Sequence, residues 1–263
     1  MFATDRELPI TGGPGKRAYV QGMFRSIAPR YDLLNHLLSA NLDRRWRRLA
    51  VDRLGGERAP GGTYLDLCAG TMDLAAELGN RPGFGGRVIA ADFAQEMLMQ
   101  GRGKSSRAVP CNADALELPF GDRSFDGATV GFGVRNLVDL DAGLREVARV
   151  LKPGARLVIL EFTTPAWQPM RALYLSYFRR MLPWVGRIIS KHRDAYSYLP
   201  ASVLEFPEPP ALAVRLEQAG FGGVRYVRLF GGVCAIHWGS REEGGVRKEE
   251  LKVVPHSSLL PPP

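Results

Sequence analysis

The sequence predicts an α/β fold in which a mostly parallel sheet is covered by helices on both faces and ends in an antiparallel strand. Two patterns predict it. From residue 64 to residue 162, short apolar segments of strand length alternate with segments whose apolar residues recur at helical spacing. Near the C-terminal end, two further strand-like segments flank Gly231 and Gly232. A two-glycine connection is typical of a β-hairpin, so the last strand should run antiparallel to its neighbour.

Each expected strand is a short apolar run bounded by turn residues. In chain order the strands are Tyr64–Leu67, Arg87–Ala91, Arg107–Cys111, Phe125–Phe132, Arg156–Phe162, Val224–Leu229 and Val233–Trp238. The expected helices are Asp73–Leu78, Gln95–Arg102, Leu140–Leu151 and Ala211–Ala219. Strands that are apolar along their length are buried on both faces, which is why we expect helices on both sides of the sheet.

The terminal segments differ in composition from this pattern. Residues 1–17 are polar and rich in glycine and proline, and we expect them to form a flexible arm. The main domain is expected to span residues 18–241 and to begin with a helical arm at 18–54, in which two short helices meet near Pro29. Residues 242–263 are charged and then proline-rich, which predicts disorder.

An insertion, residues 163–209, separates the fifth strand from the C-terminal hairpin. It carries an apolar stripe at helical spacing, formed by Met170, Leu173, Tyr174, Tyr177, Phe178 and Met181. Two interpretations stay open. The stripe belongs either to a helix that caps the core of the domain or to a lid over an apolar substrate.

The composition bounds the class of protein. Among 263 residues, 45% are hydrophobic and 24% charged, as in ordinary globular proteins. The sequence has no apolar run of the ~18–20 residues that span a bilayer, and its first residues do not resemble a secretory signal. Cys68, Cys111 and Cys234 are far apart in the sequence, which disfavours a disulfide framework and a zinc site. We therefore expect a cytoplasmic protein without a metal.

The chain is basic, with a formal net charge of +8 and a pI near 9.7. An arginine-rich composition explains this, and so would contact with an anionic membrane or with nucleic acid. Two basic clusters are present: Arg44, Arg45, Arg47 and Arg48 around Trp46, and Lys191, His192 and Arg193. Neither has the interleaved aromatic residues on which single-stranded bases stack, so we expect no nucleic-acid partner.

Three acidic residues follow three successive predicted strands. Asp66 ends the first strand, Asp92 ends the second and Asp114 follows the third. Ligands of α/β sheets bind beyond the carboxyl ends of the strands, where helix N-termini present backbone N–H groups. Asp92 lies 22 residues after Gly70, close to the spacing at which an acid meets a ribose hydroxyl. The three acids together indicate a nucleotide-binding site.

The loop after the first strand reads LDLCAGTMDLA and begins at Leu65. Gly70 can take a tight turn, and Thr71 places a hydroxyl near the start of the next helix. The loop lacks the GxGxxG pattern of dinucleotide sites, and Met72 stands where such loops usually have a second glycine. The Met72 side chain either points into the pocket, where it would crowd a cofactor, or points back toward the helix, where a flexible methionine costs little.

The D-x-x-x-G spacing, with an acid after the second strand and another after the third, resembles the class I S-adenosylmethionine-dependent methyltransferases. Three segments narrow this resemblance: FRSIAPRYDLLNHLLSANLDRRW, FGVRNLVDLDAGLREVARVLKPGARLVILEFTTP and YSYLPASVLEFP are similar to those that mark the ubiquinone/menaquinone biosynthesis C-methyltransferase family. The similarity runs from about Val20 to Gly239. It implies a class I methyltransferase Rossmann-like sheet, with S-adenosyl-L-methionine as the methyl donor and no metal.

The resemblance also implies which residues hold the cofactor. By the family's pattern they are Thr71, Asp92, Asp114 and Ala115, to which the loop adds Asp66 and Gly70. The acid after the second strand would bind the ribose hydroxyls, and the segment after the third would hold adenine. This sequence departs from the pattern at Met72, at Asp43, where the arm usually has histidine, and at Gly131, often a serine that contacts the cofactor.

The reaction that the resemblance implies is C-methylation of a polyprenylated quinol. We favour demethylmenaquinol as the acceptor, which would become menaquinol in menaquinone biosynthesis. Methylation of 2-methoxy-6-polyprenyl-benzoquinol in ubiquinone biosynthesis stays open, as does a catalytically weak cofactor-binding scaffold of a quinone-synthesis complex. A methyltransferase acting on sterols or phospholipids is a further alternative.

Arg135 and Asn136 follow the fourth strand and are expected to face the cofactor pocket as catalytic residues. Ionising the hydroxyl next to the ring carbon would make that carbon more nucleophilic. We predict that Arg135 stabilises the developing oxyanion or orients a water that takes the proton. The alternative for Arg135 is a surface ion pair with Asp139 or Asp141.

Tyr31 in the helical arm and His237 in the last strand are further candidates for contact with that hydroxyl. A histidine within a strand is more often a structural residue whose ring nitrogens are satisfied. The sequence alone does not choose between these roles for His237.

A substrate with a long apolar tail comes from the membrane. The insertion stripe and the N-terminal arm could form an apolar entrance, and Arg179, Arg180 and Arg187 could rest this entrance on anionic lipid. We therefore expect peripheral contact with the inner face of the membrane. A homodimer stays open.

Overall fold

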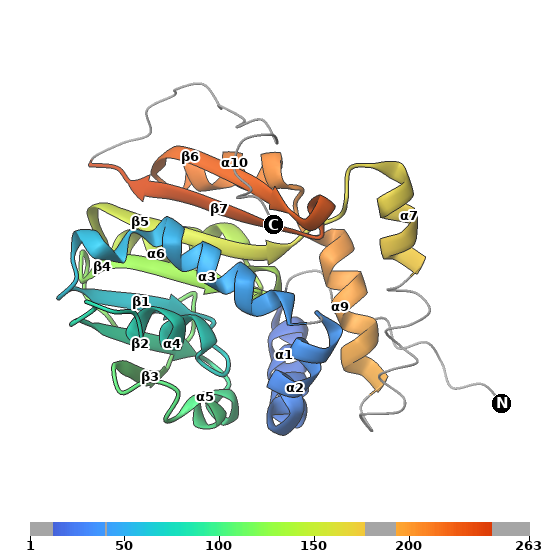
Figure 1. The fold of residues 1–263 in the computed structure, drawn as a ribbon, viewed down its shortest axis with the longest axis horizontal. Helices are drawn as coiled ribbons and strands as arrows, with labels where there is room; N and C mark the ends of the chain where they lie inside the picture. The colour runs from blue at the N-terminus through green and yellow to red at the C-terminus, as the bar shows by residue number, and fades with distance from the viewer. Residues whose placement is uncertain (1–12, 40, 177–192, 244–263) are drawn as a thin grey trace.

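The computed structural model describes residues 13–39, 41–176 and 193–243. Within them lies a seven-stranded sheet with the strand order β3-β2-β1-β4-β5-β7-β6 (Figure 1). The pairs β1·β2, β1·β4, β2·β3 and β4·β5 are parallel, whereas β7 is antiparallel to both β5 and β6. The predicted mostly parallel sheet with an antiparallel last strand is confirmed.

The strands lie close to their predicted positions. They are β1 Thr63–Leu67, β2 Arg87–Asp92, β3 Ala108–Asn112, β4 Phe125–Gly131, β5 Leu151–Phe162, β6 Phe221–Leu229 and β7 Cys234–Arg241. The largest difference is the early start of β5. Gly154 adopts a positive φ of 75°, and the pairing with β4 shifts register between Phe125 and Gly127. Pro153 and Gly154 therefore form an irregularity within the strand rather than a turn before it.

The helices are α1 Pro14–Ile27, α2 Tyr31–Leu38, α3 Leu42–Leu54, α4 Asp73–Gly79, α5 Gln95–Gly101, α6 Leu140–Val150, α7 Gln168–Ser176, α9 Arg193–Glu205 and α10 Pro209–Gln218. The helical arm differs from the prediction. It begins at Pro14, because proline is favoured in the first turn of a helix, and it holds α1, α2 and α3 rather than two helices. A 3₁₀ turn at Ala28–Arg30 joins α1 to α2, and Asn41, at a φ of 61°, precedes α3.

Helices cover both faces of the sheet, and each face has its own core. Residues from α6 and α10 pack on one face with Leu65, Leu67, Phe125, Leu157 and Ile159. Residues from α3 and α4 pack on the other face with Tyr64, Val88, Val158, Leu160 and Ile236. Successive residues of β5 thus point to opposite cores, as the alternation of side chains along a strand requires. The expected burial of the sheet on both faces is confirmed.

The strand order reverses at β1, with β2 and β3 on one side and β4 and β5 on the other. Connections on the two sides of such a point run in opposite directions and open a crevice at the carboxyl ends of the strands. Asp66 pairs with Ala90 of β2 and Thr129 of β4, so these three strands end at nearly the same level. Helices α1 and α2 lie at this end of the sheet, and α9 lies beside them (Figure 1).

The insertion contributes α7 and α9 to the described part of the chain. Of the predicted stripe, Met170, Leu173 and Tyr174 lie on α7, where Tyr174 is buried and Leu173 is exposed. Tyr177, Phe178 and Met181 lie outside the described residues, as do Arg179, Arg180 and Arg187. No helix in the described segments is long and apolar enough to cross a membrane.

Candidate active site

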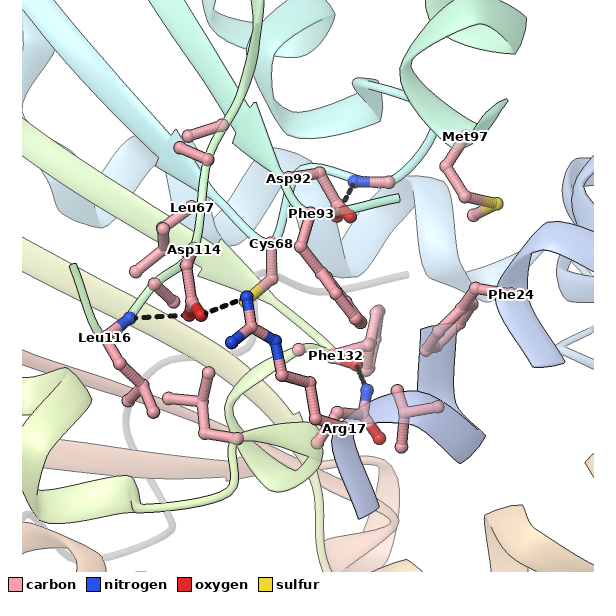
Figure 2. A pocket seen from close by; sticks show the side chains of 18 of the residues that line it. Arg17, Phe24, Leu67, Cys68, Asp92, Phe93, Met97, Asp114, Leu116 and Phe132 are labelled. Atoms are coloured by element: carbon pink, nitrogen blue, oxygen red, sulfur yellow. Dashed lines mark hydrogen bonds and ion pairs between the residues drawn. The ribbon is translucent and has the colours of Figure 1, made fainter. Parts of the chain in front are cut away.

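A cavity lies at the carboxyl ends of β1, β2 and β4 (Figure 2). The walls come from the loops after the first four strands and from helices α1 and α2. Of the predicted site residues, the cavity brings together Gly70, Asp92, Asp114, Ala115 and Asn136.

Asp92 ends β2 and joins two loops of the cavity. Its Oδ2 accepts a hydrogen bond from the Gly70 backbone N at 2.8 Å, and its Oδ1 accepts one from the Ala94 backbone N at 2.8 Å. Burial raises the pKa of Asp92, and the bonds from these N–H groups oppose that shift. A carboxylate offers about four lone-pair sites, so both oxygens can accept further hydrogen bonds from a ligand in the cavity.

Asp114 lies after β3 on the other side of the cavity. Its Oδ1 accepts a hydrogen bond from the Leu116 backbone N at 3.0 Å, and its Oδ2 lies 2.7 Å from the guanidinium of Arg17 (Figure 2). Arg17 belongs to α1, so this ion pair draws the helix over the cavity. Sequence reasoning missed Arg17 because it fell within the arm that was expected to be flexible.

Two glycines form narrow points of the cavity wall. Gly70 has a φ of 53°, and a Cβ built on it would touch the Met97 side chain at 3.4 Å. A Cβ on Gly131 would come within 2.6 Å of the Leu74 side chain. Leu74 therefore occupies the space that the usual serine at position 131 would need, which accounts for the departure from the family pattern there.

A second compartment adjoins the cavity. The two share Tyr31, Cys68, Gly70, Gly131 and Phe132. The remainder of the compartment is polar and includes Arg47, Asp66, Thr71 and Asp73. A compartment with both positive and negative side chains suits a zwitterion such as the α-amino and carboxylate groups of an amino acid.

Asp66 is 1% exposed and ties β1 to its neighbours. Its Oδ2 accepts a hydrogen bond from the Ala75 backbone N at 2.9 Å, and its Oδ1 accepts one from the Thr129 hydroxyl at 3.0 Å. Burial raises the pKa of Asp66 to about 7, against the opposing hydrogen bonds from Thr129 and Ala75. Its carboxyl group is therefore close to half ionised at neutral pH, and a bound cation would favour ionisation.

An ionic network lines the outer side of this compartment. Thr71 donates its hydroxyl to Asp32 at 2.5 Å, and the Lys104 ammonium donates to Asp32 and Asp73 at 2.6 Å each. Arg47 lies 3.2 Å from Asp73. Sequence reasoning selected only Thr71, because the other members come from elements that are distant in the sequence and carry no motif.

Asp43 on α3 is 3% exposed and holds Arg47 in place. It accepts hydrogen bonds from His36 at 2.8 Å, from Ser39 at 2.7 Å and from Arg47. Burial alone would raise the pKa of Asp43, but the hydrogen bond from Ser39 and the charge of Arg47 bring it below its ordinary value. A carboxylate can accept from three donors at once, which a histidine ring cannot, so Asp43 suits this network.

Met72 is the N-cap residue of α4, with φ 65° and ψ 28°. Glycine is favoured in this left-handed conformation, which accounts for the usual glycine. The side chain is 1% exposed and packs in the core of the α3 and α4 face, where its Cγ lies 2.7 Å from a Cβ built on Gly101. It lines neither compartment. Of the two interpretations, the one in which Met72 points away from the pocket is confirmed.

Arg135 lies in η3, the 3₁₀ turn Val134–Asn136 after β4, and its side chain is 7% exposed. Its guanidinium bonds Glu161 of β5 at 2.6 Å. Burial raises the pKa of Glu161, and the Arg135 charge opposes that shift. The alternative of a surface ion pair with Asp139 or Asp141 is wrong, since Asp139 caps α6 and Asp141 pairs with α10.

Asn136 and Tyr31 line the cavity, whereas Arg135 and His237 do not. The Asn136 amide nitrogen donates toward the Phe132 carbonyl at 3.5 Å (Figure 2). Tyr31 lies where the two compartments meet, and burial raises its pKa. His237 is 2% exposed, its Nε2 bonds the Pro209 carbonyl at 3.0 Å, and burial lowers its pKa to about 4. It is a structural histidine.

Comparison with known proteins shows which family this chain resembles. Residues 14–241 match the ubiE/COQ5 methyltransferase family. The demethylmenaquinone methyltransferase of Thermus thermophilus is 50% identical over 223 residues, which cover 83% of this chain and 100% of that protein. The ubiquinone/menaquinone biosynthesis C-methyltransferase UbiE of Geobacter sp. (strain M21) is 44% identical over 84% of this chain and 96% of its own.

A solved structure has a similar fold at low sequence identity. It is the SAM-dependent methyltransferase, possible histamine N-methyltransferase, from Thermotoga maritima. It is 16% identical to this chain, with a TM-score of 0.58 over 84% of this chain and 99% of that one. The class I methyltransferase fold expected from the sequence is therefore confirmed.

Proposed function

The chain belongs to the ubiE/COQ5 methyltransferase family, and we propose that it transfers a methyl group from S-adenosyl-L-methionine to a ring carbon of a polyprenylated quinol. The acceptor that we favour is demethylmenaquinol, because a relative with 50% identity is named demethylmenaquinone methyltransferase. The observation that carries the proposal is a cavity with two adjoining compartments, one lined by Asp92 and Asp114 and the other by Arg47 and Asp66.

The larger cavity fits the adenosine half of the methyl donor. Asp92 has acceptor capacity left for the ribose hydroxyls, and Asp114 and Ala115 would lie beside the adenine. Gly131 lines both compartments and places no side chain between them. When bound, the cofactor supplies a methyl group already activated on a sulfonium, so the proposal involves no metal.

The polar compartment fits the methionine half. Arg47, fixed by Asp43 and Asp73, would face the carboxylate of the amino acid. Asp66 and Asp73 offer carboxylates to the ammonium group. The buried position of Met72 leaves this compartment clear, which argues against a disabled cofactor loop and hence against the scaffold alternative.

On the acceptor side, we propose that the Arg135 guanidinium stabilises the oxyanion that develops when the ring hydroxyl loses its proton. Glu161 positions that guanidinium through the 2.6 Å contact. Helix α1 helps to exclude water, because the Lys16 ammonium is buried and donates to the backbone carbonyls of Arg135 at 3.1 Å and Leu137 at 2.8 Å. Burial lowers the pKa of Lys16.

The insertion would lead the apolar tail of the acceptor to the membrane surface. Trp167, just before α7, and Leu173 on α7 are each 67% exposed. Large apolar side chains exposed on one short segment suit contact with the headgroup region of a bilayer. A preference for anionic over neutral vesicles at low salt would support this part of the proposal. Equal binding to both would remove it. The cytoplasmic location and the homodimer stay predictions.

The proposed function is tested by methyl transfer from labelled S-adenosylmethionine to two chemically reduced acceptors with short tails. One is a demethylmenaquinol and the other is the 2-methoxy-6-prenyl-benzoquinol. We expect label in the naphthoquinol product at a higher rate than in the benzoquinol product. The reverse order would move the chain to ubiquinone biosynthesis, and label in neither, with the cofactor bound, would reject a quinol acceptor.

A further inference from the structure

Three buried polar atoms near η3 have no hydrogen-bond partner among the described residues. They are Arg135 Nε, Asn136 Oδ1 and Tyr198 Oη. Buried polar atoms are almost always paired in folded proteins, because an unpaired one loses its hydration without compensation. Three such atoms in one region indicate a binding site in which a polar ligand supplies the missing hydrogen bonds.

Tyr198 is the residue by which the insertion contributes to this site near η3. It lies on α9, is 2% exposed, and packs its ring against Tyr19 of α1 with the centroids 5.6 Å apart. Helix α9 packs on η3, which carries Arg135 and Asn136. Burial raises the pKa of Tyr198 to about 12, and the nearby charges of Arg135 and Glu161 also act on it. Asn136 lines the cofactor cavity, so this cluster meets the cavity at Asn136.

The three atoms differ in hydrogen-bonding character. Arg135 Nε can only donate, and the Tyr198 hydroxyl, which stays protonated, donates to an anionic or carbonyl oxygen. The Asn136 amide nitrogen is directed at the Phe132 carbonyl, which leaves Oδ1 as an acceptor. Two donors and one acceptor match a ring that carries one oxyanion and one hydroxyl.

We infer that Arg135 Nε, Tyr198 Oη and Asn136 Oδ1 bind the two ring oxygens of the methyl acceptor, and that they select the reduced ring over the oxidised ring. This inference rests on the proposed function. An oxidised ring has two carbonyl oxygens and no O–H, so it would leave Asn136 Oδ1 buried and unpaired. Sites built to bond a hydroxyl reject analogues that lack it for this reason. Tyr198 is then a substrate-positioning residue supplied by the insertion.

The first test is the variant Tyr198→Phe, which keeps the ring packed on Tyr19 and removes one oxygen. We expect the KM for the reduced acceptor to rise about tenfold, as loss of one buried hydrogen bond gives. The Kd for S-adenosylhomocysteine should change less than twofold. The melting temperature should not fall, because the hydroxyl has no hydrogen-bond partner among the residues that the structure describes.

Tyr64→Phe is the matched control. The Tyr64 hydroxyl donates to the carbonyls of Gly56 at 3.3 Å and Ala59 at 3.1 Å, far from the cavity in the core of the α3 and α4 face. We expect the opposite pattern, a lower melting temperature with an unchanged KM. A Tyr198→Phe enzyme that behaves like Tyr64→Phe would overturn the inference.

The second test addresses the oxidation state of the ring. The oxidised acceptor is used as an inhibitor of transfer to the reduced one, and its Ki is compared with the KM of the reduced form. In the wild type we expect the Ki of the oxidised acceptor to be at least ten times the KM of the reduced acceptor. In Asn136→Ala we expect this ratio of Ki to KM to be smaller. Equal ratios in both proteins would overturn the selection of the reduced ring.

The two tests separate this inference from the proposed function. If the wild-type protein methylates neither quinol, the proposed function fails and the inference fails with it. If the wild-type protein methylates a quinol and Tyr198→Phe leaves its KM unchanged, the proposed function stands and the inference alone fails.

Discussion

Asp92 lines the cavity, and Arg135 precedes Asn136, which also lines it. The two residues differ in how fully the rest of the chain satisfies their hydrogen-bonding groups. Both oxygens of Asp92 accept backbone N–H bonds, and Asp114 is likewise paired. Around Arg135, by contrast, Nε and the neighbouring Asn136 Oδ1 are buried without a partner among the described residues.

This difference separates two ways of building a binding site. On the cofactor side, carboxylates are held by strand ends and loops, so their positions are fixed before a ligand arrives. On the acceptor side, polar atoms keep hydrogen-bonding capacity that only a ligand can use. Substitutions on the acceptor side should therefore leave the affinity for the cofactor nearly unchanged, whereas binding of the acceptor should depend on the acceptor-side residues.

The largest effect is expected from Asp92→Ala. Two hydrogen bonds from ribose hydroxyls to a carboxylate contribute ~1.5–3 kcal/mol each, so the Kd for S-adenosylhomocysteine should rise at least ~100-fold by calorimetry. Asp126→Ala is the control, because Asp126 also accepts a backbone N–H, from Thr63, but sits at the start of β4. If both variants lose cofactor affinity equally, Asp92 acts only through the fold.

Arg135→Gln should have the second-largest effect, a loss of kcat without a loss of cofactor affinity. Removing one donor to a developing oxyanion costs ~10²–10³ in kcat, while the Kd for S-adenosylhomocysteine should stay within twofold. Stability should also fall, because Glu161 loses its partner in the core and its pKa, already raised by burial, rises further without the Arg135 charge.

The double variant Arg135→Gln/Glu161→Gln separates these two effects. Without the buried carboxylate, the melting temperature should recover toward the wild-type value while kcat stays low. Arg215→Gln, which breaks the exposed pair with Asp141, serves as a neutral control. Recovery of kcat together with stability would show that Arg135 is structural.

A tenfold effect is expected from pH on the cofactor side. Because the folded pKa of Asp66 is about 7, a bound ammonium group must favour its ionised form. The affinity for S-adenosylhomocysteine should rise about tenfold from pH 6 to pH 8, and Asp66→Asn should abolish this dependence. Parallel pH profiles in both proteins would assign the effect to another group.

Asp66 should also make stability depend on pH, but in the opposite direction: the free energy of unfolding should fall as the pH rises. Its folded pKa is raised above its unfolded value, so its contribution is fully present below about pH 4 and is lost as the pH rises through about 7. Chemical unfolding of the ligand-free wild type should show this loss, and Asp66→Asn should reduce it. An unchanged slope in the variant would contradict the burial of an ionisable carboxyl at this position.

The smallest effect on affinity is expected from Met72→Gly. The side chain lines neither compartment, so the Kd for the cofactor should change less than twofold. Stability should fall by ~1–3 kcal/mol, because the loss of a buried methionine outweighs relief of its left-handed backbone. A marked gain in affinity would show that Met72 obstructs the site.

The same division explains what could be predicted from the sequence. Asp66, Asp92 and Asp114 were found because each follows a strand, and the ends of parallel strands meet at one edge of the sheet. Arg47 and Lys104 were not found, since neither follows a strand and their contacts join elements distant in the chain. The role of Met72 depended on the direction of one side chain, which its neighbours in the core determine.

The measurement that tests the account most directly is a crystal structure with S-adenosylhomocysteine and a short-tailed demethylmenaquinol, kept reduced. The account predicts the ribose at Asp92, the amino acid between Arg47 and Asp66, and the ring oxygens at Arg135 and Tyr198. A ring bound away from η3 and α9, with Tyr198 still unpaired, would contradict the division between a preformed cofactor side and a ligand-completed acceptor side.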